Sequence, residues 1–187
     1  MVNIWDVWQP HIRRIVTNPI DASKVLSIGD HLSEIFRTTG NAGRAQGELS
    51  GGGAAWESLV LWYINLCCAG SRVVAIKKKS QVPMPIRDAV TVSYGNLSCN
   101  TESDITVLVF PDRNIYTQDN PLFLTRSGRI NYEVLNPSVG EHFNEFGVGI
   151  IQCKTNWNDN AQIPMLWDMI YSAGAFRDMR INVGRNN

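Results

Sequence analysis

The spacing of apolar residues changes once along this chain, near residue 70, and that change limits the folds it can adopt. Before it, apolar side chains recur every three or four positions, as they do on one face of an α-helix. The segments with this spacing, and therefore the expected helices, are 4–16, 21–40 and 54–69. Asp21 is placed to cap the second helix, and Gly40 to end it.

After residue 70 short runs of β-branched and other apolar residues replace the helical spacing, which indicates strands. The expected strands are 72–76, 89–94, 105–110, 130–135 and 148–153, with a helix at about 161–173 and a last short strand at 179–183. Too few helices separate these strands for regular βαβ repeats. The fold class is therefore α+β, or mixed α/β: a central mixed sheet flanked by helices, with additional N-terminal helices.

Length and composition favour one domain spanning residues 1–187. The chain has 187 residues, of which 44% are apolar, so it can build one sizeable core. Its formal net charge of zero argues against a uniformly basic nucleic-acid coat protein, although local basic patches remain compatible with DNA binding. The region 1–53 contributes N-terminal helices and a glycine-rich loop, and 54–183 contributes the main core.

Several features indicate a cytoplasmic protein. None of the four cysteines forms a Cys-x-x-Cys pair, so reduced thiols are expected rather than a zinc site or disulfides. The first residues lack the basic and apolar regions of a signal peptide. No apolar run approaches the length of about 18 residues that a membrane helix needs, so no membrane partner is expected. The glycine-rich loop at 40–53 lacks the Gly-Lys-Ser/Thr ending of a nucleotide-binding P-loop.

Three polar residues at strand ends carry the strongest chemical signal. Asp104 precedes the strand 105–110, while Gln152 and Lys154 stand two positions apart at the end of 148–153, so their side chains share one face. Cys153 then points the other way, into the core. Mg²⁺ prefers oxygen ligands, and a nearby lysine can orient a water or stabilise charge on a phosphate. If the two strands are neighbours, these residues suit metal-dependent phosphodiester hydrolysis.

Two segments resemble the PD-(D/E)xK nuclease superfamily, which includes most type II restriction endonucleases. They are Ser103-Asp104-Ile105-Thr106-Val107 and Gly149-Ile150-Ile151-Gln152-Cys153-Lys154. The resemblance implies a restriction-endonuclease-like core over 54–183, with Asp104 as a metal ligand, Gln152 in the second acidic position and Lys154 as the catalytic lysine. It adds Glu57, in the first turn of the expected 54–69 helix, as a further catalytic and metal-binding residue. The implied cofactor is Mg²⁺, with Mn²⁺ as a substitute.

The chain departs from the family pattern in two ways. Gln152 replaces an acid; its carbonyl can bind a metal without supplying charge, which lowers the expected affinity. Asp104 and Gln152 are 48 positions apart, so the segment at about 111–146 is interpreted as an insertion, and such insertions often read DNA in this family.

Other polar residues are alternatives for the same role. Asp112 follows Pro111 and matches the family name literally, but eight residues of strand place it about 26 Å from Asp104. Glu141 and Glu145 precede their strand by several residues. His142 is an alternative general base. Each preferred residue also has a structural alternative: Glu57 can favour a helix N-terminus, Asp104 can cap a turn, Gln152 can bond backbone and Lys154 can be solvated.

DNA contacts are expected from basic and amide side chains near these elements. The candidates are Lys77, Lys78, Lys79, Arg126, Arg129, Asn156, Asn158 and Asn160. Lysines contact phosphates, arginine reads guanine and asparagine pairs with adenine edges. Structural alternatives remain open: a lysine run also protects a strand edge, and Asn158 or Asp159 also caps a helix.

The sequence therefore predicts a magnesium-dependent, sequence-specific double-stranded DNA endonuclease of the type II restriction type, leaving 5′-phosphate ends. A palindromic site favours a homodimer, and a toxic nuclease needs a protecting DNA methyltransferase as companion. The first alternative is a repair, resolvase or modification-dependent nuclease of the same superfamily. The second is a non-catalytic DNA-binding or interaction subunit.

Overall fold

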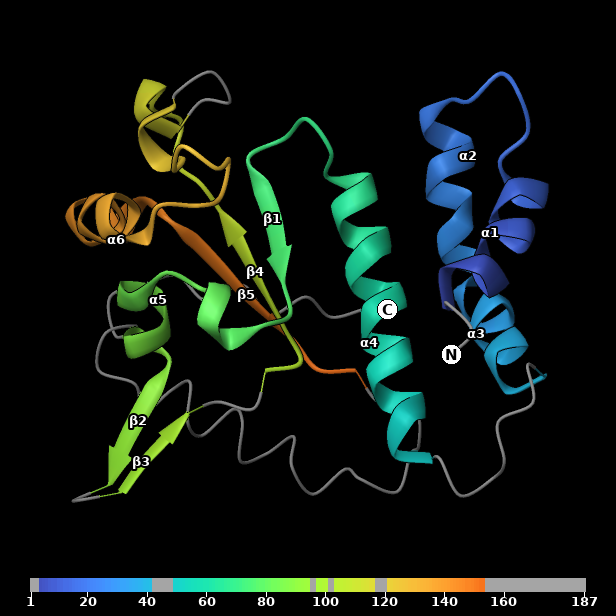
Figure 1. Cartoon of the computed structure of the whole chain (residues 1–187), viewed down its shortest axis with the longest axis horizontal. Helices are drawn as coiled ribbons and strands as arrows, with labels where there is room; N and C mark the ends of the chain where they lie inside the picture. Colours follow the sequence, from blue (N-terminus) through green and yellow to red (C-terminus); the bar gives the residue numbers. More distant parts are fainter. Residues whose placement is uncertain (1–3, 42–48, 95–96, 101–102, 117–120, 154–187) are drawn as a thin grey trace.

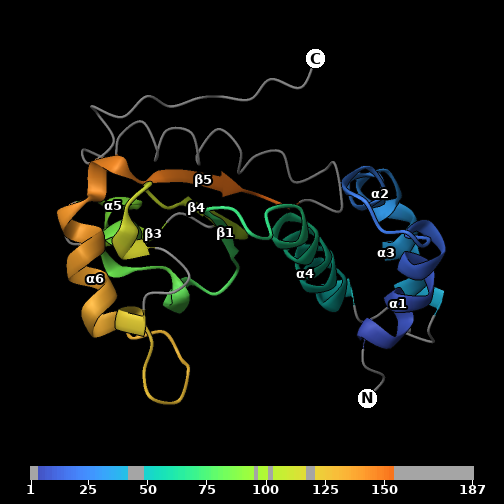
Figure 2. The same ribbon diagram turned by 90° about the horizontal axis from the view of Figure 1, so that it is seen from above.

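The computed structural model describes residues 4–41, 49–94, 97–100, 103–116 and 121–153, and these residues form an α+β fold. Figure 1 shows three N-terminal helices beside a long helix, α4 (Leu49–Cys67), followed by a small sheet. Seen from above in Figure 2, the parts stand in a row: α5 and α6, the sheet, α4, and the N-terminal helices. No helix in the described ranges is long and apolar enough to cross a membrane.

The N-terminal helices pack against one side of α4. They are α1 (Ile4–Ile15), α2 (Ala22–Ser27) and α3 (Leu32–Asn41), with a 3₁₀ turn at Ile28–His31 between the last two. Their apolar faces form a core with Ala55 and Leu59 of α4. The expected N-cap is confirmed, since Oδ1 of Asp21 accepts a hydrogen bond from the Lys24 backbone N–H at 2.9 Å.

The helix expected at 21–40 is interrupted where α4 comes close. A Cβ placed on Gly29 would lie 2.5 Å from Oη and 2.9 Å from Cζ of Tyr63, a residue of α4. The Tyr63 hydroxyl donates to the Leu26 carbonyl at 2.8 Å. Glycine in the 3₁₀ turn therefore lets the two elements approach until this bond forms.

α4 begins at Leu49 rather than at 54, so the loop predicted for 40–53 is wrong at both ends. Gly51, Gly52 and Gly53 lie within α4, and α3 continues past Gly40 to Asn41. The helix survives its glycines because it is covered on two sides, by α1–α3 and by β1, and tertiary packing outweighs helix propensity. The segment 42–48 lies outside the described ranges.

The described strands that carry the predicted site form a three-stranded antiparallel sheet in the order β1-β4-β5. Its members are β1 (Val73–Ile76), β4 (Ile105–Val109) and β5 (Gly147–Ile151). Predicted strands 72–76, 105–110 and 148–153 are confirmed to within two residues at each end. The mixed sheet that was expected is not seen in the described part of the chain, where every strand pair is antiparallel.

A second core lies between the sheet and two helices, α5 (Met84–Ala89) and α6 (Tyr132–Glu141). Its buried members are Val82, Ile86, Leu108, Leu135, Val139 and Phe146. Short 3₁₀ turns complete this region at Lys79–Gln81, Asn114–Tyr116, Pro121–Phe123 and Phe143–Glu145. The described residues between 111 and 146 thus cover part of the sheet.

Two strand predictions are corrected here. Residues 130–135 were expected as a strand, yet Tyr132–Glu141 is helical. Leu135 and Val139 are both buried and stand four positions apart, which is the spacing of one helix face. The short segment 130–135 alone fits the spacing of a helix or of a strand. The strand expected at 89–94 is shorter, because α5 ends at Ala89 and the hairpin of β2 (Thr91–Tyr94) and β3 (Leu97–Asn100) follows. The helix at 161–173 and the strand at 179–183 fall beyond the described residues.

α4 also covers the open edge of β1. The Asn65 side-chain amide donates to the Ala75 carbonyl at 3.0 Å, and its Oδ1 accepts from the Ala75 N–H at 2.9 Å. One side chain thus takes the place of a neighbouring strand. This attachment fixes α4 beside the sheet and brings its N-terminal half toward the end of β1, where the candidate site lies.

Candidate functional site

The strand register brings Asp104 and Gln152 together. Ile105 pairs with Ile151 at the last position of the antiparallel β4–β5 ladder. One residue further out, Asp104 therefore lies opposite Gln152. Oδ2 of Asp104 accepts a hydrogen bond of 2.6 Å from the Cys153 backbone N–H, which ties the segment before β4 to the segment after β5. The two strand ends joined in the sequence analysis are neighbours in space.

Gln152 carries an unusual feature for a side chain at a strand end. Its Oε1 is buried and has no hydrogen-bond partner in the described part of the structure. Leaving a buried carbonyl unsatisfied costs about 1–3 kcal/mol, so such atoms usually have a partner. Hard divalent cations take oxygen ligands of this kind. The arrangement is thus compatible with a divalent ion between Asp104 and Gln152.

Glu57 approaches the same end of the sheet from α4. Figure 1 shows the chain leaving β5 beside the N-terminal half of this helix. Because α4 begins at Leu49, Glu57 lies in its third turn rather than its first. The interpretation of Glu57 as a charge that favours a helix N-terminus is therefore wrong, since that effect is confined to the first turn.

Lys77 follows the last residue of β1 and pairs with Glu57. Its Nζ lies 2.9 Å from Oε2 of Glu57 and donates to the Ala54 carbonyl at 2.8 Å and to Oγ of Ser58 at 3.1 Å. All three ammonium protons thus have partners on α4. This contact is absent from the sequence-based predictions, in which Lys77 is one of three equivalent lysines. The available signal was its position directly after a strand whose neighbour is the Glu57 helix.

The Cys153 thiol lies within the electrostatic field of the whole group. Burial raises its pKa to about 11, helped by the negative charges of Asp104 and Glu57 and opposed by Lys77. The Cys153 side chain was expected in the core, but it is half-buried. Charged residues in α4 and at the ends of β1 and β4 therefore influence the thiol that follows β5.

Four of the other predicted DNA contacts lie among the described residues, and all four are exposed. Lys78 and Lys79 are exposed after β1, unlike Lys77. Arg126 and Arg129 are exposed in a turn closed by the bridge between Leu124 and Ile130. Lys154, Asn156, Asn158 and Asn160 lie outside the residues that the structure describes, so their roles stay predictions.

The rival acids occupy the opposite end of the sheet. Asp112 is exposed beyond the last residue of β4. Glu145 accepts two hydrogen bonds from Arg113, at 2.7 and 2.6 Å, and this guanidinium lowers the pKa of its carboxyl. Nδ1 of His142 lies 3.0 Å from the Tyr116 hydroxyl and 3.0 Å from the Ser138 carbonyl. Glu141 is exposed at the end of α6.

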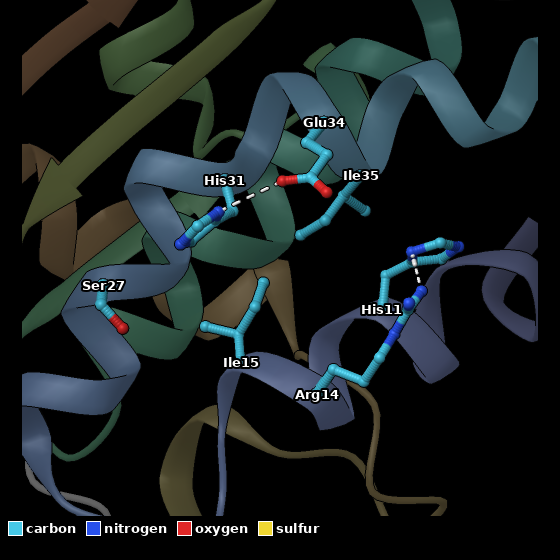
Figure 3. Close-up of a pocket in the computed structure, with 7 residues that line it drawn as sticks. All are labelled: His11, Arg14, Ile15, Ser27, His31, Glu34 and Ile35. Atoms are coloured by element: carbon cyan, nitrogen blue, oxygen red, sulfur yellow. Dashed lines mark hydrogen bonds and ion pairs between the residues drawn. The ribbon is translucent and has the colours of Figure 1, made fainter.

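A pocket of about 380 Å³ lies elsewhere, between α1 and α3 (Figure 3). Four of its polar side chains pair with one another: Arg14 with Nδ1 of His11, and His31 with Glu34 at 3.3 Å. Ile15 and Ile35 line the same space. None of the residues predicted for the site contributes to it.

Comparison of the chain with protein-family models, with curated proteins and with solved structures finds no match. Within the described ranges, no three His, Cys, Asp or Glu side chains gather closely enough to hold a metal ion. A metal at this strand end would therefore depend on the Gln152 amide in addition to the carboxylates of Asp104 and Glu57.

Proposed function

We propose that this protein is a magnesium-dependent endonuclease of double-stranded DNA, of the sequence-specific restriction type. One observation carries the proposal: Asp104 lies opposite Gln152, whose buried Oε1 lacks a partner among the described residues. A carboxylate beside an unsatisfied amide oxygen suits a hard divalent cation. Mn²⁺ is expected to substitute for Mg²⁺.

In this proposal Asp104, Gln152 and Glu57 hold the cation. When bound, the ion supplies polarisation of the phosphate and a lowered pKa for the attacking water. The Asp104 carboxylate stays oriented because the Cys153 N–H donates to Oδ2. Lys154, from sequence, has the role of orienting the water and stabilising charge on the phosphate. Hydrolysis then leaves 5′-phosphate and 3′-hydroxyl ends, as in the family that the motif resembles.

The test compares two acids at opposite ends of β4. Asp104→Asn keeps an acceptor for the Cys153 N–H but removes the charge, so plasmid cleavage in Mg²⁺ should fall by about 100-fold or more, the scale seen when one electrostatic contact is removed from an active site. Asp112→Asn makes the same chemical change beyond the other end of β4, and this variant should cleave DNA like the wild type. Equal activity of Asp104→Asn and wild type would exclude this site.

The choice of substrate separates the alternatives. Discrete fragments from unmodified linear duplex support a restriction enzyme, and sequencing their ends gives the recognition sequence. Cleavage confined to branched or methylated DNA identifies a repair, resolvase or modification-dependent nuclease. DNA binding without cutting, unchanged by EDTA, identifies a non-catalytic subunit.

A further inference from the structure

Lys77 differs from an ordinary surface lysine in its partial burial and in its contacts with α4. Its side chain is 28% exposed and that of Glu57 is 23% exposed, so the pair is partly withdrawn from water. Two of its partners, the Ala54 carbonyl and Oγ of Ser58, belong to the same helix as Glu57. The ammonium is therefore held on α4 by contacts that do not involve the carboxylate.

The pair lies at the end of the sheet where the proposed site stands. Ile76, the last residue of β1, pairs with Thr106 of β4, so Lys77 follows β1 at the same end of the sheet as Asp104. Opposite charges attract more strongly where water is partly excluded. Lys77 is the cation that the described part of the structure places on Glu57.

We propose that Lys77 is a resident counter-cation of this site: it neutralises Glu57 in the ion-free protein and releases that carboxylate when a divalent ion binds. The inference rests on the proposed function, because it assigns Glu57 to the ion. It gives Lys77 a role other than the phosphate contact expected from sequence. The lysine thereby sets the ion concentration at which the site fills.

Lys77 would keep two of its three partners after the exchange. When the Glu57 carboxylate turns to an ion, Lys77 keeps the Ala54 carbonyl and the Ser58 hydroxyl as acceptors. Its four-carbon side chain can adjust without moving β1. A bound divalent ion would bring more charge than the ammonium and would give Oε1 of Gln152, which the lysine leaves unpaired, a partner.

The experiment measures ion affinity without DNA, by calorimetric titration of Mg²⁺ and Mn²⁺ into the full chain. Lys77→Met removes the competing charge, so the dissociation constant should fall by about fivefold or more. Thermal unfolding in EDTA should show a lower Tm than wild type, and saturating Mn²⁺ should reduce that difference. Lys77→Arg keeps a cation and should bind ions like the wild type.

Lys24→Met is the matched control. Lys24 has a similar exposure of 30%, donates to two neutral oxygens as Lys77 does, and also stands near an acid, Asp21, at 3.9 Å, but it belongs to α2. It should leave the ion affinity unchanged. In a Glu57→Gln background, Lys77→Met should no longer tighten ion binding, since the two residues act as a pair. If Lys77→Met does not fold, Lys77→Gln serves for the same titration.

The outcomes separate the two proposals. A wild-type protein that binds no divalent ion refutes the proposed function. A wild-type protein that binds the ion, with an unchanged dissociation constant in Lys77→Met, refutes the counter-cation alone. Unchanged ion affinity combined with weaker DNA binding by Lys77→Met would return the residue to the phosphate-contact role.

Discussion

Single residues in this protein are constrained by contacts that cross between elements. Gly29 is the sharpest case, because the space that its missing Cβ would fill is taken by the Tyr63 ring. This contact cannot be predicted from the sequence, since Tyr63 lies in a different helix and nothing in the local pattern joins the two residues. Composition alone would treat Gly29 as an ordinary weak point of a helix.

Gly29→Ala should destabilise the fold by about 1–3 kcal/mol, the usual cost of overpacking. The new Cβ displaces the Tyr63 hydroxyl from the Leu26 carbonyl. Urea unfolding gives the free energy directly. Gly53→Ala is the control, because its Cβ meets only Oε1 of Glu57 at 4.0 Å, and it should stabilise helix α4 by about 0.5–1 kcal/mol. Equal effects of the two substitutions would contradict the close approach.

The residues of the candidate site show how far sequence reasoning reaches. Asp104 and Gln152 could be paired in advance, because each borders a clear strand and an antiparallel neighbour brings such ends together. The link between Glu57 and Lys77 could not, because it depends on which turn of α4 faces the end of β1. That turn is fixed by the attachment of Asn65 to Ala75, which joins two elements and leaves no pattern in the sequence. The start of α4 was also predicted five residues too late, since no cap signal stands among the glycines.

At the scale of elements, the decisive contact is the attachment of α4 to β1. Asn65 satisfies both backbone groups of Ala75 that an edge strand leaves open. Protected edges of this kind prevent pairing with strands of other molecules. The helix that carries Glu57 is thus aligned with the sheet by a side chain two turns further along.

Asn65→Ala leaves the Ala75 N–H and carbonyl unpaired, so the free energy of unfolding should fall by about 1–3 kcal/mol. Light scattering on heating should show earlier aggregation than in the wild type. Asn65→Asp keeps the acceptor for the Ala75 N–H but loses the donor to its carbonyl. Its free energy of unfolding should lie between those of the wild type and Asn65→Ala. A wild-type unfolding curve for Asn65→Ala would show that the helix does not protect this edge.

Helix α6 shows why an element can be misassigned from sequence. Helix α6 was expected as a strand over part of its length because a short apolar run fits both periods. Its helical state follows from Leu135 and Val139, which are buried against the sheet beside Phe146. The choice between helix and strand is made by the sheet, because it determines which apolar side chains become buried.

At the scale of the whole molecule, α4 separates two cores. Ala55 and Leu59 belong to the core with α1–α3, while the sheet, α5 and α6 form the other. A helix covered on two sides is apolar around most of its surface, as α4 is. The α+β class followed from the sequence, whereas this division into two cores did not, because periodicity says nothing about which helix joins which layer.

Under the proposed function, the molecule should act as a pair. A symmetric DNA site presents two scissile bonds, and each chain supplies one Asp104–Gln152 cluster. Light scattering on the protein with a cleavable duplex in Ca²⁺ should give a protein mass of about twice the 20.9 kDa of one chain. A complex holding a single chain, yet cutting both strands in Mg²⁺, would contradict this arrangement.

The β4–β5 ladder also bears on when the protein becomes competent during its synthesis. Its last pair joins Ile105 to Ile151, so Asp104 and Gln152 meet only after nearly the whole described chain has been made. A ribosome-bound fragment ending before β5 contains Glu57, Lys77 and Asp104 but lacks Gln152 and the Cys153 N–H. Under the proposed function, an unfinished chain lacks part of the ion site and cannot cleave DNA, which would protect the cell during translation.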